Sequence, residues 1–284
     1  LSMKDQPIIT LIGSGVMGEA LVGGILNNNL TSPENVRAAD PLVDRGEALQ
    51  RAFGVQPYTD NAAAVKGADI VILSVKPQRL DKVLAGLRGK IEPDALVLSI
   101  VAGASIETIA GGLDHPAVVR SMPNTPAQIG EGITIWTASE EITEGQQETA
   151  RALLAALGQE IYVEEESYLD MATALSGTGP AYVFLFMEAM IDAGVHLGFP
   201  RRIAEQLVVQ TVRGSVDYYS QNSTHPASLR NQVTSPGGTS AAALYYLEKA
   251  GFRTAISRAV WAAFERSQEL GKGRNSQPPD KTGE

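Results

Sequence analysis

Cysteine is missing from this chain of 284 residues, and histidine occurs only three times. The absence of cysteine excludes disulfides, thiolate zinc sites, iron–sulfur clusters and a cysteine nucleophile. The histidines, His115, His196 and His225, do not have the spacing of a metal-ligating pair, so we expect no metal site. We interpret His196 and His225, which lie in helix-rich regions, as structural residues.

Positive charge is also scarce, because 23 Lys and Arg stand against 32 Asp and Glu, a formal net charge of −9. Such a chain lacks the basic surface that neutralises nucleic-acid phosphates, so we expect no nucleic-acid partner. The longest apolar stretch, 181–199, is interrupted by Glu188 and Asp192, and we judge it too short and too charged for a membrane span. No signal-peptide pattern is visible, and we expect a cytoplasmic protein.

Short apolar runs alternate with helical patterns through residues 1–165. This alternation is typical of a parallel sheet covered by helices on both faces. The expected strands are 8–13, 36–39, 69–75, 95–100, 117–120, 133–137 and 160–163, and helical stretches between them include 16–29, 42–53, 77–86 and 144–157. The sequence therefore predicts an α/β domain with a doubly wound sheet.

Strand patterns stop after residue 165, and a second domain over 166–271 is expected to be all helical. The expected helices are 167–175, 180–197, 200–221, 226–233, 239–250 and 252–271. Their faces are rich in Ala, Leu and Val, which favours a homo-oligomer; a self-contained bundle is the alternative. The polar tail 272–284 is predicted to be disordered.

A glycine fingerprint, G-x-G-x-x-G, lies between the first expected strand and helix. Its residues are Gly13, Ser14, Gly15, Val16, Met17 and Gly18. The first glycine permits a tight turn, the second lets backbone approach a pyrophosphate, and the third allows close contact of helix and strand. We therefore predict a dinucleotide site at the helix N-terminus.

Asp40 ends the second expected strand, where an acid binds the ribose of NAD and repels the 2′-phosphate of NADP. Arg45 follows in the next helix and could instead pair with that phosphate, or be a solvated surface charge. The residues leave the choice of cofactor open.

Two proline-containing turns follow strands at the same expected edge of the sheet, where doubly wound sheets bind ligands. One turn is Ser74, Val75, Lys76 and Pro77, and the other, 122–126, contains Pro123 and Asn124. We assign both to the cofactor crevice; the alternative is that proline only stiffens the turns.

A second glycine-rich loop, SPGGTS over 235–240, lies in the helical half. Gly237 and Gly238 can turn several N–H groups toward one point, and we expect Thr239 or Ser240 to cap the next helix. Such a loop suits a carboxylate. The alternative is a capped loop without a ligand.

These motifs, in order, resemble the Δ1-pyrroline-5-carboxylate reductase family. The resemblance runs from about residue 8 to residue 271 and includes IGSGVMGEAL, SVKPQ, RSMPNTPAQIGEG, LSGTGPAYVF and HPASLRNQVTSPGGTS. It implies a Rossmann-type domain followed by a helical dimerisation domain, with larger rings such as decamers. It also implies hydride transfer from NAD(P)H to pyrroline-5-carboxylate, which gives L-proline.

The resemblance further implies a substrate cradle of Ser235, Gly237, Gly238 and Thr239, with the Ser240 hydroxyl facing the ring nitrogen. Ser240 replaces the threonine of the family pattern, and Thr178 replaces a serine. The residue matching Asn61 contacts the adenosine end of the cofactor in the family, and NADPH is commonly preferred there. We expect NADPH, with NADH possible, because Asp40 opposes that preference.

Two other functions fit part of the sequence. A β-hydroxyacid dehydrogenase would need a lysine after a glycine-rich turn near 170–180, where Lys249, Lys272 and Lys281 do not lie. A regulatory NAD(P)-binding protein would keep the first glycine loop but would not need the second.

Overall fold

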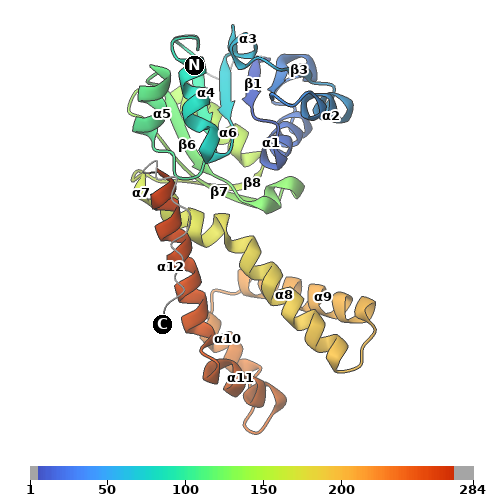
Figure 1. The fold of residues 1–284 in the computed structure, drawn as a ribbon. Coiled ribbons are helices and arrows are strands. Elements are labelled where there is room, and N and C mark those ends of the chain that lie inside the picture. The colour runs from blue at the N-terminus through green and yellow to red at the C-terminus, as the bar shows by residue number, and fades with distance from the viewer. Residues whose placement is uncertain (1–5, 272–284) are drawn as a thin grey trace, which may run out of the picture. The chain divides into compact units, whose positions relative to one another are not determined.

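The computed structural model describes residues 6–271 (Figure 1), so the predicted tail 272–284 lies outside the described residues. These residues form two compact units. One contains the chain up to Thr178 together with the described residues from Ala263 onward, and the other is Gly179–Ala262. This division differs from the predicted boundary at 165/166, because helical periodicity does not tell against which unit a helix packs.

The first unit contains an eight-stranded sheet with the order β3-β2-β1-β4-β5-β6-β7-β8. The strands are β1 (Ile9–Ile12), β2 (Val36–Ala39), β3 (Gln56–Tyr58), β4 (Ile70–Leu73), β5 (Leu96–Ser99), β6 (Val118–Met122), β7 (Gly132–Ala138) and β8 (Gly158–Tyr162). Strands β1 to β6 are parallel to one another. Strand β7 runs antiparallel to β6, and β8 is parallel to β7. The predicted doubly wound sheet is confirmed, with a reversed pair of strands at one edge.

Strand β3 was not predicted. It has three residues, and its central Pro57 cannot donate to a ladder, so no apolar run marks it in the sequence. It lies at the edge of the sheet, where proline is tolerated.

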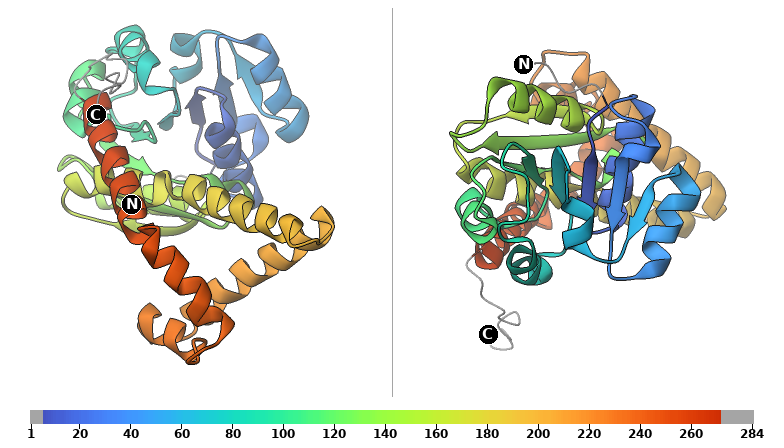
Figure 2. Two further views of the ribbon diagram at one scale, coloured as in Figure 1. Left: turned by 60° about the horizontal axis from the view of Figure 1, so that its bottom comes forward. Right: turned by 90° about the horizontal axis from the view of Figure 1, so that it is seen from above.

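Helices cover both faces of the sheet (Figure 2). On one face lie α1 (Val16–Asn27), α2 (Val43–Phe53) and α6 (Glu144–Ala155), and on the other α3 (Asn61–Val65), α4 (Leu80–Leu87) and α5 (Ile106–Leu113). Alternate residues of one strand therefore enter different cores: Ile72 of β4 packs with the first group and Val71 with the second. Burial on both faces explains why these strands read as continuous apolar runs.

The second unit is all helical, as predicted. Its helices are α8 (Gly179–His196), α9 (Arg201–Ser220), α10 (Pro226–Gln232), α11 (Thr239–Lys249) and the first part of α12 (Phe252–Gly271). In this unit only Ala204 and Val208 are buried, whereas Leu185, Tyr246 and Trp261 expose more than 60% of their surface. The alternative of a self-contained bundle is therefore wrong.

One long apolar helix corrects the expectation about membrane spans. Helix α7 (Ser167–Ala172), the π-helical turn η4 (Thr173–Gly177) and α8 run on from one another over 30 residues, long and apolar enough to cross a bilayer. The stretch 181–199 was judged too short because the sequence does not show that these segments join. Length and composition do not decide between a bilayer and a protein partner.

Candidate active site

The predicted cofactor residues of the first unit all follow the carboxyl ends of strands. Gly13 follows β1, Asp40 follows β2, Ser74 follows β4 and Pro123 follows β6, while Asn61 begins α3 after β3. Because β1 to β6 are parallel, these ends meet at one edge of the sheet. The structure therefore places the predicted cofactor residues along that edge.

Two glycines of the fingerprint are required by packing. Gly13 has a φ of +99°, and a Cβ there would lie 2.6 Å from the Ser74 carbonyl oxygen. A Cβ on Gly18 would lie 2.7 Å from the Gly13 carbonyl oxygen. The turn of Ser74–Pro77 therefore packs directly on the glycine loop, and its Ser74 N–H donates to the Ile12 carbonyl at 2.8 Å.

Gly15 has a different role, because a Cβ there would have no atom within 4 Å. It is the N-cap of α1 and supplies no side-chain cap, so N–H groups of the first turn have no acceptor within the helix. The neighbouring Ser14 hydroxyl is buried and has no hydrogen-bond partner among the described residues. Open space, uncapped N–H groups and an unpaired hydroxyl suit a phosphate group.

The remaining side chains of the glycine loop, 13–18, and of the turn 74–77 offer few groups that could bind a ligand. Met17 and Val75 are partly buried and pack against the two cores, so they offer backbone rather than side-chain contacts. Val16 and Lys76 are exposed, and Lys76 precedes Pro77, the first residue of the short turn η2 (Pro77–Arg79). Lys76 is the positively charged side chain of these two segments.

Asp40 is bound to the glycine loop. Its Oδ2 accepts the Ser14 N–H at 2.9 Å, and its Oδ1 accepts the Leu42 N–H at 2.9 Å. Asn61 lies half-buried at the first position of α3, next to Asp60, which caps that helix. Arg45 is exposed in α2.

The residues after β6 have identifiable structural contacts. Pro123 is buried, and the Asn124 Oδ1 accepts the Ile133 N–H at 2.9 Å, which holds the start of β7. Asn124 is also the N-cap of the turn η3 (Thr125–Ile129), whose Ala127 packs in the same core as α1. These contacts hold the turn in place beside the crevice, and contact of Pro123 and Asn124 with the cofactor stays a prediction.

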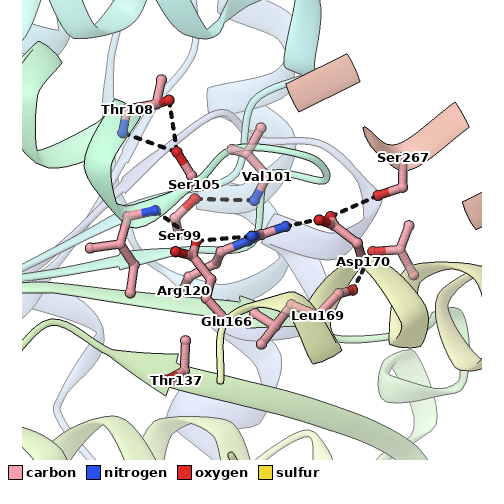
Figure 3. Close-up of polar contacts among 12 residues, drawn as sticks. Ser99, Val101, Ser105, Thr108, Arg120, Thr137, Glu166, Leu169, Asp170 and Ser267 are labelled. Atoms are coloured by element: carbon pink, nitrogen blue, oxygen red, sulfur yellow. Dashed lines mark hydrogen bonds and ion pairs between the residues drawn. The ribbon is translucent and has the colours of Figure 1, made fainter. Parts of the chain in front are cut away.

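A buried ionic cluster near this edge was not predicted (Figure 3). Arg120 of β6, with a side chain 6% exposed, donates to Glu166 at 2.9 Å and to Asp170 of α7 at 2.8 Å. Glu166 also accepts the Ile106 N–H of α5, and Asp170 accepts the hydroxyl of Ser267 in α12. One arginine thus joins four segments. In the sequence, its only mark is a charge inside an apolar run.

Residues 173–178, which include most of LSGTG, are held by hydrogen bonds from their own hydroxyl groups to backbone carbonyls. Thr173 and Ser176 donate to carbonyls four residues back, and the Thr178 hydroxyl and N–H both donate to the Thr173 carbonyl at 2.8 Å. A Cβ on Gly177 would lie 2.7 Å from the Met122 side chain, so this glycine permits close packing. The serine-to-threonine departure at Thr178 therefore keeps a hydroxyl that closes a π-helical turn.

The second glycine loop, 235–240, lies in the helical unit between α10 and α11. Gly237 has a φ of +73°, and the Gly238 N–H donates to the Ser235 carbonyl at 3.0 Å. The expected cap was wrong: Gly238 is the N-cap of α11 without a side-chain cap, and Thr239 and Ser240 are its first residues. The first N–H groups of α11 therefore stay open for an anion, because glycine has no side chain to satisfy them.

The two histidines of the helical unit differ in role. The His225 Nδ1 accepts the Ala227 N–H at 3.2 Å and so caps α10, which confirms a structural role. His196 lies in the last turn of α8. Its structural role stays a prediction.

Relatives with known names decide the family. A pyrroline-5-carboxylate reductase of Synechocystis is 43% identical over 262 residues, 92% of this chain and 97% of that protein. The enzyme of Methanosarcina acetivorans is 40% identical over 95% of this chain and its own full length. This chain belongs to the pyrroline-5-carboxylate reductase family.

Two further comparisons agree with membership of the pyrroline-5-carboxylate reductase family. The family model described as pyrroline-5-carboxylate reductase dimerisation matches residues 166–270, and one described as NADP oxidoreductase, coenzyme F420-dependent, matches residues 8–103. A crystal structure of the Plasmodium falciparum reductase with NADP bound is 31% identical, with a TM-score of 0.87 over 95% of this chain and all of that one. The matched dimerisation region supports oligomer formation.

Proposed function

We propose that this protein reduces Δ1-pyrroline-5-carboxylate to L-proline with NAD(P)H, the last step of proline biosynthesis. The observation that carries this proposal is near full-length identity of about 40% to reductases of that name. The proposed reaction also requires a dinucleotide site and a carboxylate site. The glycine loop 13–18 suits the dinucleotide, and the glycine loop 235–240 suits the carboxylate.

Residues of the sheet unit hold the cofactor in this proposal. The N-terminus of α1 receives the pyrophosphate, since Gly15 leaves room for it and the Ser14 hydroxyl is unpaired. The Ser74–Pro77 turn forms the neighbouring wall, and Asp40 and Asn61 lie toward the adenosine end. Pro123 and Asn124 shape the crevice through their packing.

Residues of the helical unit hold the substrate. The open N–H groups at the start of α11, with Ser235, Gly237, Gly238 and Thr239, bind the substrate carboxylate. The Ser240 hydroxyl hydrogen-bonds the ring nitrogen. Because this hydroxyl is a weak acid, it orients the imine rather than donating its proton outright.

When bound, NAD(P)H supplies a hydride to the C=N carbon, and one proton taken up at nitrogen completes proline. A cyclic imine protonated from solvent accepts hydride readily, so the chain needs no strong general acid. The protein contributes orientation of the two reactants. This agrees with a structural role for His225 and with the absence of cysteine.

The apolar helices of the second unit are proposed to pack on those of a second copy as a dimer, with dimers assembling further, to a decamer in the largest case. Exposed Leu185, Tyr246 and Trp261 and the matched dimerisation region support this. A protein partner for α8 would also explain its apolar length without a membrane, consistent with a cytoplasmic enzyme that needs no nucleic acid.

The direct test measures oxidation of NADPH and NADH by the purified protein with and without pyrroline-5-carboxylate. Oxidation that requires this substrate, with proline as product, supports the proposal. Cofactor binding without turnover would favour the regulatory protein, and oxidation of β-hydroxy acids with NAD(P)⁺ would favour the dehydrogenase.

A further inference from the structure

The ionic cluster around Arg120 joins the two helical segments that connect the units. Among the described residues, the chain passes between the units twice, after Thr178 and after Ala262. The first crossing lies in the continuous helical stretch of α7, η4 and α8, and the second lies within α12. Asp170 of α7 precedes the first crossing, and Ser267 of α12 follows the second. One Asp170 oxygen accepts both the Arg120 guanidinium at 2.8 Å and the Ser267 hydroxyl at 3.0 Å (Figure 3), so this carboxylate joins both segments on the sheet-unit side.

Close backbone packing fixes the same two segments to the carboxyl edge of the sheet. A Cβ on Gly177 of η4 would lie 2.7 Å from the side chain of Met122, the last residue of β6. A Cβ on Gly103, in the loop after β5, would lie 2.9 Å from the backbone nitrogen of Gly271 in α12. Each helical segment is therefore held at two places in the sheet unit, once by the carboxylate of Asp170 and once by a glycine.

The two connecting segments lead to the loop 235–240, which the proposed function assigns to the substrate carboxylate. Helix α11 begins at the end of this loop, and only Ala250 and Gly251 separate it from α12. A shift at the sheet-unit end of α12 would therefore displace the loop through α11. Reduction is sensitive to such a shift, because a misplacement of about 1 Å can lower a rate about 100-fold.

The pyrophosphate end of the cofactor site lies away from this cluster. The glycine loop 13–18 follows β1, whereas Arg120 lies in β6, three strands further along the sheet, or about 14 Å at the usual strand spacing. The hydrogen bonds of the cluster lead to α5, α7 and α12. A change in the cluster should therefore alter the reduction while the affinity for the cofactor stays nearly constant.

We propose that Asp170 is a positioning residue for the reduction: together with Arg120 and Ser267 it holds the ends of the helical segments that carry the substrate loop. The inference rests on the proposed function, because it requires the loop 235–240 to bind the substrate. The three side chains take no part in the chemical step, and they act through the helices alone.

The test uses Ser267→Ala, which removes one hydrogen bond from Asp170 and leaves its ion pair with Arg120. Steady-state kinetics on the full-length protein should give a kcat/KM for pyrroline-5-carboxylate about tenfold below that of the wild type. The dissociation constant of NADPH, from fluorescence titration, should stay within about twofold. Ser267→Thr keeps the hydroxyl and should retain most of the activity.

The matched control is Thr31→Ala. The Thr31 hydroxyl is buried like that of Ser267, and it donates to the Pro7 carbonyl at 2.8 Å. Thr31 and Pro7 precede β2 and β1, so this hydrogen bond lies at the opposite edge of the sheet from the cofactor. Thermal unfolding should show a loss of stability in both alanine variants, whereas kcat/KM should fall only in Ser267→Ala.

Hydrogen exchange measured by mass spectrometry tests the hold on the helix ends without any substrate. Amides of 173–178 and 263–271 should exchange about tenfold faster in Ser267→Ala than in the wild type, because local opening no longer breaks the bond to Asp170. In Thr31→Ala the exchange of these two segments should match that of the wild type.

Four results would overturn the inference. They are an unchanged kcat/KM in Ser267→Ala, an equal decrease in Thr31→Ala or in Ser267→Thr, a parallel loss of NADPH affinity, and unchanged exchange of both segments. A wild-type protein that does not reduce the imine would refute the proposed function and with it the role in catalysis. Faster exchange in Ser267→Ala would still show, in that case, that Asp170 holds the helix ends.

Discussion

The Arg120 guanidinium donates to the Asp170 carboxylate at 2.8 Å across 50 residues of sequence, and the same carboxylate oxygen accepts the Ser267 hydroxyl at 3.0 Å. Strand β6, helix α7 and the end of α12 therefore meet at one buried ion pair. The backbone of α12 also approaches Gly103, where a Cβ would lie 2.8 Å from the Ser267 carbonyl oxygen. This packing explains why 263–271 belongs to the sheet unit.

Replacement of Arg120 should be costly. Arg120→Met leaves Glu166 and Asp170 as partly buried acids without their cation, and we expect a loss of about 3 kcal/mol in the free energy of unfolding. Urea denaturation at one fixed protein concentration measures it, because oligomers gain stability with concentration. The control Arg51→Met removes an exposed i,i+4 pair with Glu47 and should cost about 0.5 kcal/mol or less. Equal midpoints for the two variants would contradict the prediction.

Alanine substitutions at Gly15 and Gly18 should have different effects on cofactor binding and on thermal stability. Gly15→Ala has room for its methyl group, so the protein should keep its thermal stability while NAD(P)H binding weakens about tenfold, a change of about 1.4 kcal/mol. Gly18→Ala meets the Gly13 carbonyl and should instead lower the melting temperature. Fluorescence titration and thermal unfolding on both variants distinguish the roles. A stable Gly18→Ala or an unstable Gly15→Ala would show that the packing assigned to these residues is incorrect.

Ser240→Ala should affect the reaction more than cofactor binding. The loss of one hydrogen bond to the ring nitrogen predicts a decrease in kcat/KM of about 10- to 100-fold, or 1–3 kcal/mol. The dissociation constant of NAD(P)H should stay unchanged. Ser240→Thr restores the residue of the family pattern and serves as the matched variant, with activity at or above that of the wild type. An unchanged rate in Ser240→Ala would remove this hydroxyl from the mechanism.

The exposed face of α8 should be needed for assembly. Leu185, 66% exposed in a single chain, becomes buried if α8 packs on a second copy, so Leu185→Glu should dissociate the oligomer or leave it aggregated. Sedimentation velocity compares its mass with that of the wild type and of Gln221→Glu, an exposed polar residue at the end of α9. A wild-type oligomer in Leu185→Glu would place the interface elsewhere.

Local signals in the sequence were enough for most elements. Burial on both faces leaves an apolar run wherever a strand lies inside the sheet, and β1, β2, β4 and β5 were found for that reason. The starts of α10 and α12 follow from Pro226 and Gly251, signals that act within a few residues. The glycine loop was visible because its spacing is a local requirement of one turn.

Contacts between distant residues were decided by the tertiary structure alone. The sequence marks Asp40 as a ribose ligand, but only the fold brings the Ser14 amide to its carboxylate. Likewise, helical periodicity marks 167–175 and 252–271 as helices, while the partners of Arg120 assign α7 and the end of α12 to the sheet unit. Periodicity and turn chemistry are properties of neighbouring residues, so the sequence alone determined most of the elements and the glycine motifs, but not the short edge strand β3. Hydrogen bonds and ion pairs between distant segments depend on how the chain packs. The tertiary structure therefore decided which groups the acids Asp40 and Asp170 bind, and where the boundary between the two units lies.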